Sequence, residues 1–167
     1  MTGAVGVEET NARKAPGVSY ALARLHQRVL AGISERVGPH GLTTLQFTTL
    51  SVLSRHGAPL STSQLARRAF MTPQSMSEVT HALEGKGLIK RNPDPNHRRT
   101  LPATLTAKGR RVLADCEEVV AAFEDSMLEG FSEEDRVAFL GMVKAAVRNL
   151  GGGFPSEETP PPPIQVT

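Results

Sequence analysis

The residues with the clearest chemical potential lie between Asn92 and Gly109, in the run NPDPNHRRTLPATLTAKG. Pro93 and Pro95 fix their own φ angles and lack backbone N–H donors, so a helix cannot continue through this segment. Arg98 and Arg99 follow and place two positive charges side by side. Paired arginines suit phosphate binding or insertion into a narrow minor groove, and the alternative is an ordinary solvated turn.

The segments on either side of the arginines predict how they are held. After the pair, apolar and polar side chains alternate in the period-two pattern of a half-buried strand: Leu101, Ala103 and Leu105 with Pro102, Thr104 and Thr106. Before the prolines, an amphipathic helix is expected to end at Gly87. A helix followed by a basic two-stranded hairpin is a winged helix, and its natural ligand is duplex DNA.

A second group of polar residues opens the helix before the hairpin. Thr72 is a good N-cap and Pro73 suits the first helical position, which together are a strong signal for a helix start. Gln74, Ser75 and Ser77 follow in the first turns, where small polar side chains can bond base edges or phosphates. The alternative is that Thr72 only caps the helix and the two serines only face water.

Further candidates lie along the same helix and at the hairpin tip. Glu78 can accept a hydrogen bond from a cytosine amine or simply point aside, and His81 can reach a phosphate. The complete set of predicted DNA-binding residues is Thr72, Gln74, Ser75, Ser77, Glu78, His81, Arg98 and Arg99.

The hydrophobic periodicity predicts the elements that must position these residues. The expected fold is mainly α-helical with one small β-hairpin, divided into a winged helix-turn-helix lobe and a helical dimerisation lobe. The last two helices carry more apolar surface than a small winged domain could cover, which favours a homodimer. The predicted parts are a loose arm (1–16), one domain (17–150) with a helix-turn-helix (61–87), a wing (88–106) and dimerisation helices (18–37, 107–129 and 132–150), and a Gly/Pro-rich tail (151–167).

Charge is distributed unevenly along the chain, although the formal net charge is only +2. Residues 61–111 hold ten basic and three acidic residues (+7), whereas residues 112–167 hold three basic and eleven acidic residues (−8). A cationic module beside an anionic one is typical of phosphate binding, and ordinary solvated helix faces are the alternative.

Composition argues against several classes of protein and site. A chain of 167 residues with one cysteine needs no disulfide, and it has neither a membrane-length apolar run nor a signal core, so a cytoplasmic protein is expected. Cys116 lies on an apolar stripe and is expected to be an inert core thiol. The five histidines lack metal-ligand spacing, and no nucleophile or phosphate-loop motif is found. We therefore expect no enzyme activity, metal or cofactor.

Three segments together resemble the MarR family of bacterial winged helix-turn-helix transcriptional regulators. They are TPQSMSEVTHALEGKGLIKR (72–91), DPNHRR (94–99) and LTAKG (105–109). The residues that match the family pattern are Leu83, Glu84, Gly87, Leu88, Ile89 and Arg91, then Asp94, Pro95 and Arg99, then Leu105, Thr106 and Gly109. His97 departs from it, because it stands where the family usually has an aspartate that pairs with an arginine of the wing.

The resemblance implies a homodimer that binds a near-palindromic operator, most often to repress transcription. It also implies that Arg99 enters the minor groove, and that a small aromatic or phenolic effector binds between the DNA-binding and dimerisation lobes. Two alternatives stay open at this level. One is a DNA-binding protein without effector control, and the other is a winged-helix module that binds another protein.

Overall fold

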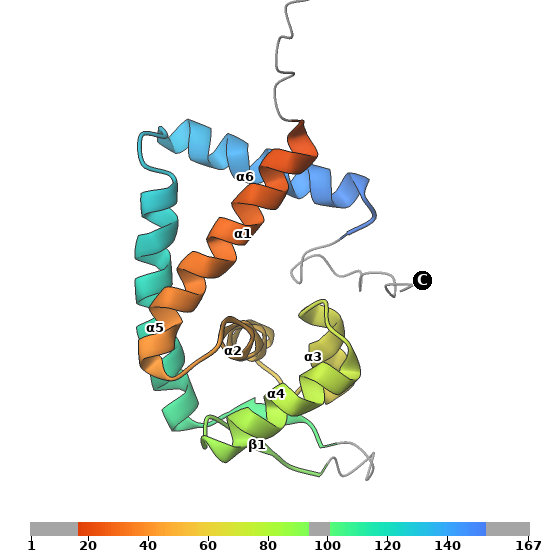
Figure 1. Ribbon diagram of the computed structural model, residues 1–167. Helices are drawn as coiled ribbons and strands as arrows, with labels where there is room; N and C mark the ends of the chain where they lie inside the picture. The colour runs from red at the N-terminus through yellow and green to blue at the C-terminus, as the bar shows by residue number, and fades with distance from the viewer. Residues whose placement is uncertain (1–16, 94–100, 153–167) are drawn as a thin grey trace, which may run out of the picture.

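The computed structural model describes residues 17–93 and 101–152. This part of the chain is mainly helical with one antiparallel hairpin, as predicted (Figure 1). In chain order the elements are α1 (Val18–Val37), the 3-10 helix η1 (Gly38–His40), α2 (Thr44–His56), α3 (Thr62–Arg68), α4 (Pro73–Gly85), β1 (Ile89–Arg91), β2 (Ala103–Leu105), α5 (Ala107–Met127) and α6 (Glu133–Asn149).

Local capping signals set the starts of these helices. The Ser61 hydroxyl accepts from the Gln64 backbone N–H, while the Gln64 side chain accepts from the Ser61 backbone N–H. Ser132 and Asp135 form the same reciprocal box at the start of α6. Because each box satisfies two N–H groups that a helix start leaves without partners, both predicted starts are confirmed.

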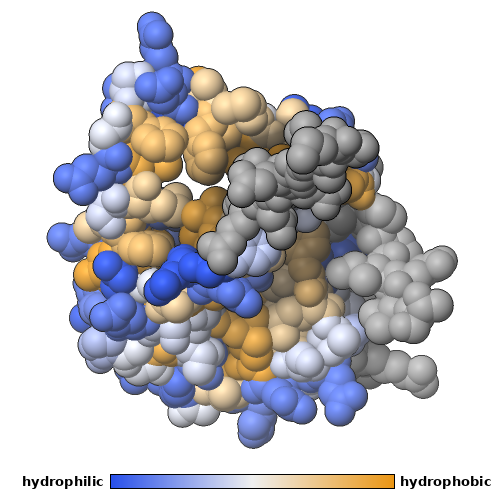
Figure 2. Space-filling model, turned by 45° about the horizontal axis from the view of Figure 1, so that its top comes forward, coloured by the Kyte–Doolittle hydropathy of each residue, from blue (hydrophilic) through white to orange (hydrophobic). Residues whose placement is uncertain are grey.

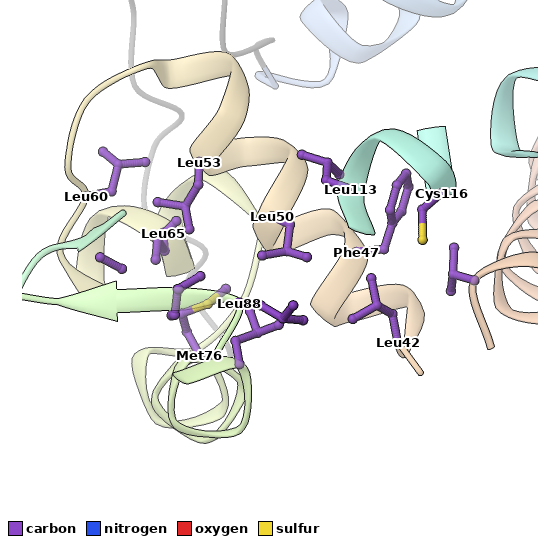
Figure 3. Packing of buried hydrophobic residues seen from close by; sticks show 14 of the residues in the cluster. Leu42, Phe47, Leu50, Leu53, Leu60, Leu65, Met76, Leu88, Leu113 and Cys116 are labelled. Carbon is purple, nitrogen blue, oxygen red and sulfur yellow. The ribbon is translucent and has the colours of Figure 1, made fainter. Parts of the chain in front are cut away.

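The winged helix-turn-helix lobe is built around one apolar core. Figure 3 shows Leu50 of α2 near its centre, with Leu65 and Met76 on one side and Leu113 of α5 on the other. Fully buried side chains come from α2, the segment before α3, α3, α4, β1 and α5: Leu50, Leu60, Leu65, Met76, Leu83, Ile89 and Leu113. This shared core fixes α3, α4 and the hairpin relative to each other, because close-packed side chains resist displacement.

The hairpin is held at its base by an additional strand-like contact. Its register pairs Ile89 with Leu105 and Arg91 with Ala103. On the other edge of β2, the Ala103 N–H donates to the Leu60 carbonyl at 2.8 Å and the Leu60 N–H donates back at 3.1 Å. The segment before α3, expected to be only an extended link, therefore extends the two-stranded sheet. Leu101 departs from the expected alternation, since it precedes β2 and is 45% exposed.

The second lobe consists of α1, α6 and the far half of α5, which runs from one lobe to the other (Figure 1). Gly32 allows α1 to approach α5 closely, because an added Cβ would come 2.3 Å from the Phe123 ring. The Arg36 guanidinium lies 4.3 Å from the centre of the same ring. In contrast, α6 has no buried residue. Within the described residues no helix has the length and apolarity of a membrane span.

Candidate nucleic-acid interface

Helix α4 is the second helix of the helix-turn-helix and therefore the predicted recognition helix, and Thr72 caps its start as predicted. Its hydroxyl oxygen accepts a hydrogen bond from the Ser75 backbone N–H at 3.2 Å and donates one to Ser75 Oγ at 2.9 Å. Pro73 occupies the first helical position, where the missing N–H costs nothing. Thr72 is exposed, so the start of α4 is open to a ligand.

Four of the predicted DNA-binding residues share one face of α4. Gln74, Ser77, Glu78 and His81 are all exposed and follow the spacing i, i+3, i+4, i+7, which puts them on one stripe of a helix. The opposite side is buried in the core through Met76, Thr80 and Leu83. The exposed face carries an amide, a hydroxyl, a carboxylate and an imidazole, all of which can form hydrogen bonds with base edges.

Ser75 stands apart from these four residues. It is partly buried and lies on a different side of the helix from Gln74. Its hydroxyl accepts a hydrogen bond from the Thr72 hydroxyl. The arrangement gives Ser75 a part in the cap at the start of α4. Accepting from Thr72 still leaves the Ser75 O–H as a donor, so its predicted contact with a base remains a prediction.

The helix end and the wing are joined by an ion pair. Arg91 of β1 donates to the Glu84 carboxylate from Nε at 2.8 Å and through a second bond from Nη2. The hydrogen bond from Arg91 lowers the pKa of Glu84, so the carboxylate is ionised well below neutral pH. Both residues belong to the first matching segment, and the structure gives them the role of fixing the wing to α4.

The LTAKG segment joins the wing to α5. Thr106 caps α5 by accepting from the Gly109 N–H at 2.9 Å, and its hydroxyl donates to the Gly87 carbonyl at 2.8 Å. Gly109 lies against the backbone of Leu88, where an added Cβ would come 2.0 Å from the carbonyl oxygen. Leu105 pairs with Ile89 across the hairpin. These matching residues therefore shape the joint that holds the recognition helix.

Several basic residues of the cationic segment bind the protein's own backbone. Lys86 Nζ donates to the Gly41 carbonyl at 2.6 Å and to Gln46 Oε1 at 2.8 Å. Lys108 Nζ donates to the Lys86 carbonyl at 2.9 Å, and Arg110 donates to the Leu105 carbonyl at 3.1 Å. Their charge still contributes to the field of this lobe. Their side chains also connect the end of α4 to α2 and α5 through these hydrogen bonds. The number of basic residues in the sequence did not predict this structural role.

Two predicted site residues, Arg98 and Arg99, lie outside the described residues, as does His97. Their predicted contacts with phosphate and the minor groove remain predictions. The described part of the wing places its base beside α4, because β1 follows that helix and Arg91 is bound to Glu84.

Cys116 is fully buried in the core, as expected. Figure 3 shows it on α5 close to Phe47 and Leu113. Burial raises the pKa of the thiol, which keeps it in the unreactive neutral form at neutral pH. Over residues 17–93 and 101–152, no cluster of three or more His, Cys, Asp or Glu side chains could hold a metal ion.

Comparison with known proteins agrees with this architecture. A sequence model of the MarR family matches residues 40–100. The HTH-type transcriptional repressor Rv2887 of Mycobacterium tuberculosis is 35% identical over 127 residues, which cover 76% of this chain and 91% of the relative. The repressor NicR of Pseudomonas putida is 25% identical over 130 residues, which cover 78% and 82%.

Solved structures give the same result. The transcriptional repressor CouR bound to a 23-mer DNA duplex superposes with a TM-score of 0.72 at 32% identity, covering 79% of this chain and 93% of CouR. Rv2887 in complex with p-aminosalicylic acid gives a TM-score of 0.64 at 33% identity, covering 78% and 98%. With its helix-turn-helix, wing and helical lobe in the same order, the chain belongs to the MarR family of winged helix-turn-helix transcriptional regulators.

Proposed function

We propose that this protein is a homodimeric transcriptional repressor that binds a near-palindromic operator and is released by a small-molecule effector. The observation that carries the proposal is the exposed polar face of α4. Thr72 caps this helix, and the ion pair between Arg91 and Glu84 fixes it to the base of the wing. CouR, which has the same fold at 32% identity, is bound to a DNA duplex, and similar relatives are named transcriptional repressors. The protein acts by binding, without catalysis, on DNA in the cytoplasm.

Dimerisation is supported by apolar side chains that the single chain leaves in solvent. They gather on α1 and α6 and just beyond α6: Val18, Tyr20, Leu22, Leu30, Val137, Leu140, Met142 and Leu150. In Figure 2, apolar residues cover much of the upper part of the view and continue down its centre. Soluble monomers rarely expose such contiguous patches, and a second copy of this chain would cover them.

The effector part of the proposal is supported by one relative. Rv2887 has been solved in complex with p-aminosalicylic acid, a small aromatic acid. We infer a small aromatic or phenolic effector for this chain, bound where the DNA-binding and helical lobes meet. A ligand that prefers the form with low DNA affinity would release the operator by shifting the population toward it.

Two experiments test the proposal. Selection of bound fragments from a genomic DNA pool should enrich a near-palindromic sequence, and titration of that duplex should saturate at two chains. A panel of aromatic acids and phenols, p-aminosalicylic acid included, should then contain a compound that raises the melting temperature and weakens DNA binding. A chain that binds DNA but responds to none of these compounds would match the alternative without effector control.

A further inference from the structure

We propose that Glu78 determines sequence specificity, and that its carboxylate accepts a hydrogen bond from the exocyclic amine of a cytosine in the major groove. The inference rests on the proposed function, because it assumes that α4 is the element that enters the groove. It adds a particular base and a particular side chain to that function.

The position of Glu78 supports a role outside the protein's own packing. It is exposed on the polar face of α4, one helical turn after Gln74 and next to Ser77. Among the described residues it has neither an ion-pair partner nor a hydrogen-bond partner for its carboxylate. Glu84, the other carboxylate of α4, is instead bound by Arg91. Glu84 is therefore structural, and Glu78 is available to a ligand.

A carboxylate such as that of Glu78 is unusual on a surface that is expected to bind phosphates. The helix Pro73–Gly85 contains neither lysine nor arginine, so no fixed positive charge on α4 itself neutralises the carboxylate. A carboxylate is repelled by phosphates, so it gains nothing from contact with the DNA backbone. It can contribute favourably only where a base presents a donor.

The chemistry of the major groove selects that base. A carboxylate only accepts hydrogen bonds, and the donors in the major groove are the N4 amine of cytosine and the N6 amine of adenine. Adenine places its N7 acceptor beside the amine, and this lone pair repels the carboxylate. Guanine and thymine present acceptors at the corresponding edge. Cytosine is the one base whose major-groove edge carries an amine donor without a neighbouring acceptor on the same base.

The same carboxylate also acts against other sequences. On a duplex without cytosine at that position, Glu78 would lose water and face acceptors or phosphates with nothing to replace its hydration. Unrelated DNA is therefore bound more weakly than the positive charge of the lobe alone would give. Glu78 thus strengthens binding to the specific site and weakens binding to other DNA, and both effects raise the ratio of specific to non-specific binding.

The test uses the full chain and a duplex selected by it from a random pool. Affinities are measured for every single-base change in one half-site, with the wild type, Glu78→Gln and Glu117→Gln. The last variant removes the same charge from an exposed position on α5, outside the α3–α4 unit, and serves as the matched control. Gln74→Ala, one turn away on α4, should change the preference at a different base pair.

For the wild type and Glu117→Gln, replacing one particular C·G pair should lower the affinity roughly 5- to 100-fold. Glu78→Gln should lose most of that preference at the same pair and bind an unrelated duplex more tightly. If Glu78→Gln keeps the full base profile of the wild type, or if the affected pair is not C·G, the inference is wrong. Failure of the wild type to select any duplex would instead overturn the proposed function.

Discussion

Gly109 offers the sharpest test of the joint that holds the recognition helix. Its Cα faces the Leu88 backbone so closely that an added Cβ would lie 2.0 Å from the carbonyl oxygen. An unstrained contact of this kind needs more than 3 Å, so Gly109→Ala must push the start of α5 away from the wing by about 1 Å or more. The hydrogen bonds from Thr106 to Gly87 and Leu88 lie directly in the path of that shift.

The expected cost follows from these contacts. Overpacking a tight site typically costs about 1–3 kcal/mol, and each weakened hydrogen bond adds about 0.5–1.5 kcal/mol. Because the chain relaxes and the terms overlap, we expect Gly109→Ala to lower the free energy of unfolding by about 2–4 kcal/mol. For a chain of 167 residues that corresponds to a fall in melting temperature of roughly 4–16 °C.

The assay is thermal unfolding followed by far-UV circular dichroism, since the chain has no tryptophan to report by fluorescence. Gly85→Ala is the matched control, because no atom lies within 4 Å of its added Cβ. It should leave stability unchanged or raise it by up to about 1 kcal/mol. Both variants are measured at one chain concentration. Equal melting temperatures for Gly109→Ala and the wild type would refute the close contact of α5 with the wing base.

Two further predictions concern the wing brace and the apolar helices. The lowered pKa of Glu84 means that its ion pair with Arg91 stabilises the fold above the ordinary pKa of glutamate, about 4.3, and that this contribution is lost as the pH falls through the lower folded value. Glu84→Gln should therefore be less stable than the wild type at pH 7, with the difference shrinking in acid; a difference independent of pH would contradict the ion pair. Leu140→Glu should shift the mass measured by light scattering from two chains toward one, because it puts a charge into the proposed dimer interface. An unchanged mass at micromolar concentration would place the interface elsewhere.

Local sequence signals were sufficient for most of the fold. The pairs Ser61 with Gln64 and Ser132 with Asp135 are separated by three residues, so a sequence contains all that is needed to recognise a helix start. Helix ends were predicted within two residues, as at Met127, where residue 129 was expected. Helix ends fray, and the last turn can stop at any of several neighbouring residues. The sequence contains little information on which of them is the last.

Contacts between distant residues could not be predicted in the same way. The strand-like pairing of Leu60 with Ala103 joins residues 43 positions apart, and a single extended residue has no recognisable pattern. Lys86 was counted as part of a cationic surface, but its ammonium group is bound by Gly41 and Gln46. Charge can be counted from a sequence, whereas the partner of each charge depends on how the helices pack.

The residues of the candidate site were predicted one by one, and the structure shows which of them share a face of α4. Helical spacing alone would have put Gln74, Ser77, Glu78 and His81 on one face, and it would have left Ser75 off it. The turn before α4 holds a feature with no sequence signal, since Phe70 adopts φ +55° and is 55% exposed. Glycine or asparagine usually fills that conformation, so a phenylalanine does not predict it.

The central claim is that this chain binds duplex DNA as a dimer through α4 and the wing. The most direct measurement is fluorescence anisotropy of a labelled duplex selected from genomic DNA, titrated with the full chain at several salt concentrations. We expect saturation at two chains per duplex, with log K falling linearly as log salt rises because bound phosphates release counterions. Failure to enrich any duplex, or binding of one chain per duplex with no dependence on salt, would contradict the claim.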